Sequence, residues 1–140
     1  MALSERAAAF FASYVESFER FDAAAIAGHF AFPCHMTSET GGEPDLRSIP
    51  DEDGWRADIE GLVGFYRSAR VATARMLEAS STPLSEAVEQ ATIHWMLEDG
   101  SGGNVYDFRA VYTLVERDGA LRIGALAHDE LPRIQTLLDG

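Results

Sequence analysis

Two histidines, one aspartate and one arginine are the residues of this sequence whose types are most typical of an enzyme. We call them the polar quartet: His94, Asp107, Arg109 and His128. Imidazoles close to a carboxylate and a guanidinium can transfer protons or hold a carboxylate substrate. A polar face that lies in solvent or at a dimer interface has the same composition, so the sequence leaves both interpretations open.

A second set of candidate residues is aromatic and indicates a ligand pocket. Its members are Tyr14, Phe18, Phe65, Tyr66, Trp95, Phe108 and Tyr112. The small side chains of Ala110, Ala125 and Ala127 leave volume beside them, which suits a flat apolar ligand. Aromatic residues that pack only against one another as a core give the same pattern. The hydroxyl of Tyr14 favours the ligand-pocket interpretation. It needs a hydrogen-bond partner or a ligand, because an unpaired buried hydroxyl costs about 1 to 3 kcal/mol.

Helices are predicted in the first half of the chain. From Leu3 to Phe21 apolar residues recur every three or four positions, which indicates a helix with one buried stripe. A short second helix over Ala23–Phe30 is expected to be capped by Asp22 and ended by Pro33.

A short strand over Cys34–Thr37 is expected next. Ser38–Gly54 is rich in glycine, proline and acids and reads as an irregular loop that flanks the pocket mouth. Asp58 is then predicted to cap a third helix, whose apolar face includes Phe65 and Tyr66.

From Val71 onward the hydrophobic period changes to two, which is typical of strands. The predicted strands are Val71–Ser80, Ser85–Glu98, Asn104–Glu116 and Ala120–His128. Short turns between them predict an antiparallel meander, and Glu130–Leu138 reads as a terminal helix or a frayed tail. Helices followed by a bent meander predict an α+β fold with the helices on one face of the sheet.

Alternation along the last three strands predicts which residues face the helices. The side that carries Trp95 and Phe108 is apolar and should turn inward, so the polar quartet should turn outward. A register that keeps the aromatic residues together places Trp95 beside Phe108 and Phe108 beside Ala127. In the polar quartet the same register pairs His94 with Arg109 and Asp107 with His128. A single bulge would reverse the alternation and bring these residues inside.

The composition limits the class of protein. A chain of 140 residues with 46% hydrophobic residues predicts one domain, 1–140, with its own core. A net charge of -12 repels phosphates, so we expect no nucleic-acid or membrane partner. The start of the chain does not resemble a signal peptide, and the lone Cys34 fits a reducing compartment, which together predict a cytoplasmic protein. The histidines lack metal-ligand spacing and no Gly-rich phosphate loop follows a strand, so no metal or cofactor is expected.

Four segments carry a resemblance to a known family. They are Phe11–Phe18 (FASYVESF), Asp22–Phe30 (DAAAIAGHF), Asp58–Tyr66 (DIEGLVGFY) and Ala110–Ile123 (AVYTLVERDGALRI). With the order of the elements, they resemble the nuclear transport factor 2-like (NTF2-like) superfamily, particularly its SnoaL-like bacterial branch. The resemblance implies a cystatin-like cone in which a curved antiparallel sheet wraps around the long first helix. It also implies a pocket at the open end and, commonly, a homodimer.

The activity does not follow from this resemblance, because the superfamily holds isomerases, cyclases, dehydratases, epoxide hydrolases and non-catalytic binding proteins. Tyr14 matches the tyrosine with which ketosteroid isomerases stabilise an enolate. Their general base falls on Ser38, beside Glu39, and their second donor falls on Ala110, so that mechanism is not kept. The Asp-Arg-Asp cluster of the epoxide hydrolases is not matched by His94–Met96 either.

Three functions remain open. The first is a small-molecule binding protein with an apolar, aromatic-lined pocket and no assignable catalytic apparatus. The second is an enzyme of the cyclase, dehydratase or isomerase type that acts on an apolar carbonyl compound with Tyr14 as hydrogen-bond donor. Its candidate bases are Glu39, His94, Asp107 and His128. The third is an interaction module that pairs with another protein through the outer sheet face, the face through which a homodimer is also expected.

Overall fold

The computed structural model describes residues 2–140, which form four helices and six strands. The helices are α1 (Glu5–Glu19), α2 (Ala23–Ala27), α3 (Glu52–Ser68) and α4 (Glu130–Asp139). The strands are β1 (Phe30–Thr40), β2 (Glu43–Ile49), β3 (Val71–Pro83), β4 (Val88–Asp99), β5 (Asn104–Arg117) and β6 (Ala120–His128). They make one sheet in the order β2-β1-β6-β5-β4-β3. The predicted α+β class is confirmed.

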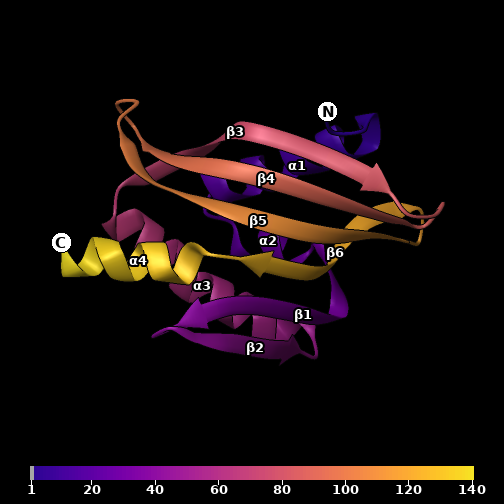
Figure 1. The fold of residues 1–140 in the computed structure, drawn as a ribbon, viewed down its shortest axis with the longest axis horizontal. Helices are drawn as coiled ribbons and strands as arrows, with labels where there is room; N and C mark the ends of the chain where they lie inside the picture. Colours follow the sequence, from indigo (N-terminus) through magenta and orange to yellow (C-terminus); the bar gives the residue numbers. More distant parts are fainter. Residues whose placement is uncertain (1) are drawn as a thin grey trace.

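The sheet curves, and α1, α2 and α3 lie together behind it, as Figure 1 shows. The buried stripe predicted for the first helix is confirmed, since Phe10, Phe11 and Tyr14 are buried on α1. Phe11 packs edge-on against Tyr112 of β5, with 4.8 Å between the ring centroids. The helix α4 lies across the end of the sheet and contacts β5 and β1. None of the helices in the described part of the chain is long and apolar enough to cross a membrane.

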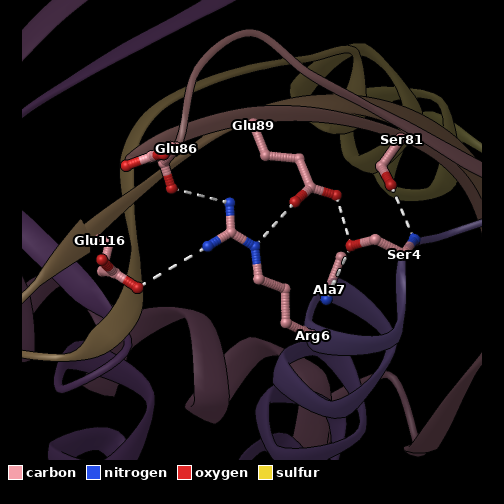
Figure 2. A network of polar contacts seen from close by, with 7 residues as sticks. All are labelled: Ser4, Arg6, Ala7, Ser81, Glu86, Glu89 and Glu116. Carbon is pink, nitrogen blue, oxygen red and sulfur yellow. Dashed lines mark hydrogen bonds and ion pairs between the residues drawn. The ribbon is translucent and has the colours of Figure 1, made fainter.

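The start of α1 is fixed to the sheet by a buried carboxylate. Glu89 of β4 is 1% exposed and accepts hydrogen bonds from Ser4 Oγ at 2.5 Å and from Arg6 Nε at 3.1 Å. The Ser4 hydroxyl oxygen also accepts from the Ala7 N–H, which makes Ser4 the N-cap of α1. Figure 2 shows this network, in which the Ser4 N–H donates to Ser81 Oγ at 2.9 Å. The network therefore sets where α1 begins relative to β3 and β4.

The second helix is shorter than predicted. Asp22 caps α2 as expected, accepting from the Ala25 N–H at 3.0 Å, but the helix ends at Ala27. Pro33 therefore lies within β1 and does not terminate the helix. The pairing of β1 with β6 is irregular between Phe30 and His35, and a residue without an N–H is tolerated at such a break in the ladder.

The segment predicted as an irregular loop is largely a hairpin. β1 and β2 pair antiparallel from Cys34 opposite Ile49 to Thr40 opposite Glu43. Gly41 and Gly42 have φ angles of 60° and 82°, and two consecutive left-handed residues make the tight turn that hairpins favour.

The third helix begins earlier than predicted. Its cap is Asp51, whose Oδ1 accepts from the Gly54 N–H at 2.8 Å, and Asp58 lies within α3. An earlier Asp with acids at the next two positions supplies the same capping chemistry, because acidic side chains favour the first turn of a helix.

The predicted meander is confirmed for β3 to β6, but β1 pairs with β6 in parallel, so the complete sheet is mixed. The β4–β5 register is also confirmed: Trp95 lies opposite Phe108 and His94 opposite Arg109. The last helical segment is the helix α4.

The predicted register between β5 and β6 is wrong, because a bulge interrupts the pairing. Leu114 lies opposite Ile123 and Thr113 opposite Ala125, so Gly124 is the extra residue on β6. A Cβ at this position would approach Val115 Cγ1 to 3.3 Å, which favours glycine here. Beyond the bulge the alternation is reversed. His128 therefore lies opposite Ala110 and not beside Asp107.

Candidate ligand-binding site

A cavity of about 340 Å³ lies between α1, α3, α4 and the concave face of the sheet. This volume is within the range of small-molecule sites. The aromatic residues of its wall are Tyr14, Phe18, Phe21, Phe30, Trp55, Tyr66, Trp95, Phe108 and Tyr112. The polar residues of its wall are Ser38, Asp45, Arg47, Asp58, Thr73, His128 and Glu130.

Most of the aromatic residues singled out from the sequence lie in this wall: Tyr14, Phe18, Tyr66, Trp95, Phe108 and Tyr112. Phe65 does not. It is half-buried and lies next to Tyr66, with 6.1 Å between ring centroids, on the adjacent face of α3. Consecutive helical residues point about 100° apart, and at this position of α3 Tyr66 lines the cavity whereas Phe65 does not.

The alanines predicted to leave volume in the pocket do not lie in its wall. The bulge at Gly124 turns Ala125 and Ala127 away from the helices and turns Leu126 and His128 inward. The small side chains that line the cavity are Ala72 and Ala74 of β3 instead.

The hydroxyl of Tyr14 makes no hydrogen bond with any group of residues 2–140, although the residue is only 7% exposed. Within that range, the single polar side-chain atom that is both fully buried and unpartnered is Trp55 Nε1. Tyr14 Oη therefore keeps accessible surface, and it does so beside the cavity that the residue lines. Burial raises the pKa of Tyr14, so the hydroxyl is a neutral hydrogen-bond donor.

Glu130 is the main polar residue of the cavity wall that was not predicted from the sequence. It is the first residue of α4 and is 8% exposed. Tyr66 Oη and Tyr106 Oη both donate to its Oε2, the latter at 2.7 Å. Burial raises the pKa of Glu130, and the two tyrosine hydrogen bonds oppose that shift by favouring the charged form. The sequence does contain one signal for Glu130. It lies four residues before the apolar Ile134, and this spacing places both side chains on one face of the helix.

The second carboxylate oxygen of Glu130 has no partner. Within the described residues, no donor reaches Oε1 and no arginine nitrogen lies within 4.0 Å of the carboxylate. Because Glu130 Oε1 has no partner and is not one of the fully buried unpartnered atoms of the described residues, it keeps accessible surface. Among the described residues that line the cavity, Glu130 Oε1 is an acceptor without a partner, and the donors without a partner include Tyr14 Oη, His128 Nε2 and the buried Trp55 Nε1.

His128 lies in the cavity wall and not on the outer face where the alternation placed it. Its Nδ1 accepts the Glu130 backbone N–H at 3.1 Å and lies 3.5 Å from Ser38 Oγ. A ring nitrogen that accepts carries no proton, so the neutral ring has its N–H at Nε2. Burial lowers the pKa of His128, which favours this neutral form.

The remaining catalytic candidates lie outside the cavity. His94 Nε2 and Asp107 Oδ2 are 2.6 Å apart on the outer face of the sheet, where Arg109 is also exposed. The hydrogen bond from His94 lowers the pKa of Asp107. Glu39 is exposed on β1, whereas its neighbour Ser38 faces the cavity. The structure therefore separates the polar quartet and brings only His128 together with Tyr14.

Charged residues gather at the part of the wall formed by β2 and α3. Arg47 Nη2 and Asp58 Oδ2 are 2.8 Å apart, and both side chains are about half exposed. Asp45 of β2 lies in the same wall. Within residues 2–140, no group of three His, Cys, Asp or Glu has the arrangement of a metal site.

The curved sheet over a long first helix and the cavity between them define the chain as an NTF2-like protein. Its sequence matches a family described as NTF2-like protein (DUF6841) over residues 4–130, and the chain belongs to this family. No curated protein sequence matches the chain significantly.

Several solved structures share the fold. Aln2 from a Streptomyces species superposes with a TM-score of 0.71 at 11% identity, over 97% of this chain and 99% of Aln2. An NTF-2 like protein of unknown function from Shewanella oneidensis gives a TM-score of 0.69 at 11% identity, over 89% and 97% of the two chains. An NTF2-like protein with a cystatin-like fold from Novosphingobium aromaticivorans gives 0.66 at 16% identity, over 96% and 87%. At these identities the similarity concerns the fold.

Proposed function

We propose that the protein binds a small, ring-containing organic molecule in this cavity. The observation that carries the proposal is the pairing of an aromatic wall with two unused polar atoms, Tyr14 Oη and Glu130 Oε1. Apolar walls with a few convergent polar groups are typical of ligand sites. The aromatic residues would bury the body of the ligand, and the two polar atoms would orient its polar end.

The alternative that these aromatic residues merely fill a core explains the cavity less well. In a filled core, side chains interdigitate with few voids larger than a water molecule. Here about 340 Å³ remains open, and the Tyr14 hydroxyl has no partner among the described residues. A cavity of this size costs stability in a purely structural core.

The experiment is a calorimetric titration of naphthylethanol, a flat probe with one hydroxyl group. Ala74→Phe fills the cavity from β3, and Ala127→Phe adds the same volume on the outer face as a matched control. We expect one-to-one binding to the wild type and to Ala127→Phe, and at least tenfold weaker binding to Ala74→Phe. Equal binding to all three proteins, or none to the wild type, would reject the proposal.

A second candidate function is proton transfer on an apolar carbonyl compound. Glu130 favours it, because a buried carboxyl with a raised pKa lies in the same cavity as a free tyrosine hydroxyl. Tyr14 would donate a hydrogen bond to the carbonyl oxygen, and Glu130 would accept the proton from the carbon next to the carbonyl. Deuterium exchange next to the carbonyl of tetralone, followed by NMR, tests this. If the wild type catalyses the exchange and Glu130→Gln does not, the result supports an enzyme. If the exchange with the wild type is no faster than in buffer, this reaction is excluded for the compound.

We also propose that the chain is cytoplasmic and forms a homodimer through the outer sheet face. Val111 is 39% exposed on that face, and Cys34 is a buried free thiol, which suits a reducing compartment. Sedimentation should give a dimer for the wild type and a monomer for Val111→Arg. A monomeric wild type would exclude the homodimer.

A further inference from the structure

We propose that the polar end of the cavity selects a cationic amine, whose ammonium group pairs with Glu130. The inference rests on the proposed function, because it assumes that a ligand enters the cavity. It adds the chemical class of that ligand.

Glu130 has no cationic partner among the described residues. The protein has 11 arginines and no lysine, and no arginine reaches this carboxylate within ion-pair distance in the described structure. A buried carboxylate without a cation is costly, since desolvation is not repaid by a partner. A ligand ammonium would supply the charge that the chain itself does not.

The cavity wall carries more negative than positive charge. Asp45, Asp58 and Glu130 contribute carboxylates, whereas Arg47 is the one arginine among the residues that line it. Arg47 is already paired with Asp58 at 2.8 Å. His128 does not compensate, because its Nδ1 accepts the Glu130 N–H and the ring is held neutral. The wall therefore has a net negative charge and would repel an anionic ligand.

The two tyrosine hydrogen bonds use only one of the two carboxylate oxygens of Glu130. Tyr66 and Tyr106 both donate to Oε2 of Glu130 and leave Oε1 unused. An ammonium group has only donors, so it can bind Oε1 without displacing either tyrosine.

The carboxylate shares the cavity wall with aromatic rings. Tyr14, Tyr66 and Tyr112 line the cavity together with Glu130, and the Tyr66 hydroxyl donates to its carboxylate. Ring faces attract ammonium groups, and aromatic cages are a recurrent way of binding them. A carboxylate among tyrosines therefore fits an ammonium better than a hydroxyl.

The test uses three probes that share one ring system: naphthylethylamine, naphthylethanol and naphthylacetate. They present a cation, a neutral hydroxyl and an anion at similar positions. Calorimetric titration into the wild type should show the amine binding at least tenfold more tightly than the alcohol, and the acetate most weakly. This comparison needs no variant and so does not depend on any substitution folding correctly.

Glu130→Gln assigns the preference to a residue, because an amide keeps the size of the side chain and accepts from both tyrosines. It should lower the affinity for the amine at least tenfold and change that for the alcohol by less than about threefold. Glu39→Gln, the same change at an exposed residue outside the cavity, is the matched control and should preserve the preference for the amine.

The outcomes separate the two proposals. If the alcohol binds the wild type as tightly as the amine, the inference is wrong and the cavity remains a ligand site. If the amine preference persists in Glu130→Gln, the assignment to Glu130 is wrong. If none of the probes binds the wild type, both the inference and the proposed function fail.

Discussion

Tyr106 of β5 and Glu130 of α4 are joined by a hydrogen bond of 2.7 Å from the tyrosine hydroxyl to the carboxylate oxygen Oε2. Tyr66 of α3 donates to the same oxygen. The first residue of α4 is therefore held from two other elements, and α4 contributes Leu131 and Ile134 to the cavity wall. The same carboxylate thus fixes the helix and supplies the free acceptor of the site.

Replacing Tyr106 with Phe removes one of the two donors to this buried carboxylate. We expect the free energy of unfolding at pH 8 to fall by roughly 1.5 to 3 kcal/mol, the usual range for a hydrogen bond to a charged group. The pKa of Glu130 should rise further, because a bond that favours its charged form is lost. Urea denaturation and an NMR titration of the labelled carboxyl measure the two effects. A lowered pKa would refute the role given to Tyr106.

Tyr14→Phe should affect binding and leave stability almost unchanged. The hydroxyl has no partner in the described structure, so its removal should change the free energy of unfolding by less than about 0.5 kcal/mol or increase it. The affinity for naphthylethanol should fall by roughly two- to tenfold, the value of one hydrogen bond. Urea denaturation and calorimetry give the two numbers. A large loss of stability with unchanged affinity would indicate a structural hydroxyl.

His128 should make the protein less stable in mildly acidic solution. Burial lowers its pKa from the ordinary value of 6.5, so the unfolded chain binds the proton more readily than the folded one. Stability is therefore fully present above this value and is lost as the pH falls below it. His128→Asn keeps an acceptor for the Glu130 N–H and removes the titration.

The pH dependence of unfolding between pH 7.5 and 5.5, in steps of about half a unit, checks this expectation. The decline should be smaller in His128→Asn than in the wild type. His29, whose pKa burial also lowers, contributes equally to both proteins and cancels in the difference. Identical pH profiles would show that His128 does not titrate in this way.

Glu89→Gln should loosen the start of α1, which the network in Figure 2 holds. Burial alone would raise the pKa of Glu89, but hydrogen bonds from Ser4, Ser81 and Arg6 lower it below 4.5. We expect a loss of roughly 1 to 3 kcal/mol near neutral pH, because Ser4 and Arg6 lose a charged acceptor.

The sign of the pH effect follows from the lowered pKa. The contribution of Glu89 is present above pH 4.5 and is lost as the pH falls through the pKa of the folded state, so Glu89→Gln should flatten the acid limb of the stability profile. Glu86→Gln is the control, since only the backbone oxygen of Glu86 takes part in the network. An equal effect of the two substitutions would contradict the role of Glu89.

The helices and the meander could be predicted because each has a clear hydrophobic period. The stripe of α1 and the pairing of Trp95 with Phe108 both follow from it. The hairpin of β1 and β2 was missed because its strands are mostly exposed and polar, so only the turn at Gly41 and Gly42 marks it. Hydrophobic periodicity alone does not reveal strands that are mostly exposed and polar.

The polar half of the site was hidden for a different reason. One extra residue at Gly124 reverses the face of everything that follows on β6, and it brings His128 into the cavity. Glu130 follows directly, and its burial depends on hydroxyl groups from α3 and β5 that are far away in the sequence. Alternation within one strand carries no information about such partners.

Intermolecular NOEs between naphthylethanol and the protein would show directly whether the ligand enters the cavity. If the cavity is the ligand site, naphthyl protons should give NOEs to ring protons of Tyr14, Trp95 and Phe108, all of which line it. His94, on the outer face, should give none. NOEs confined to His94 and its outer-face neighbours would show that the probe binds the outer face of the sheet and not the cavity.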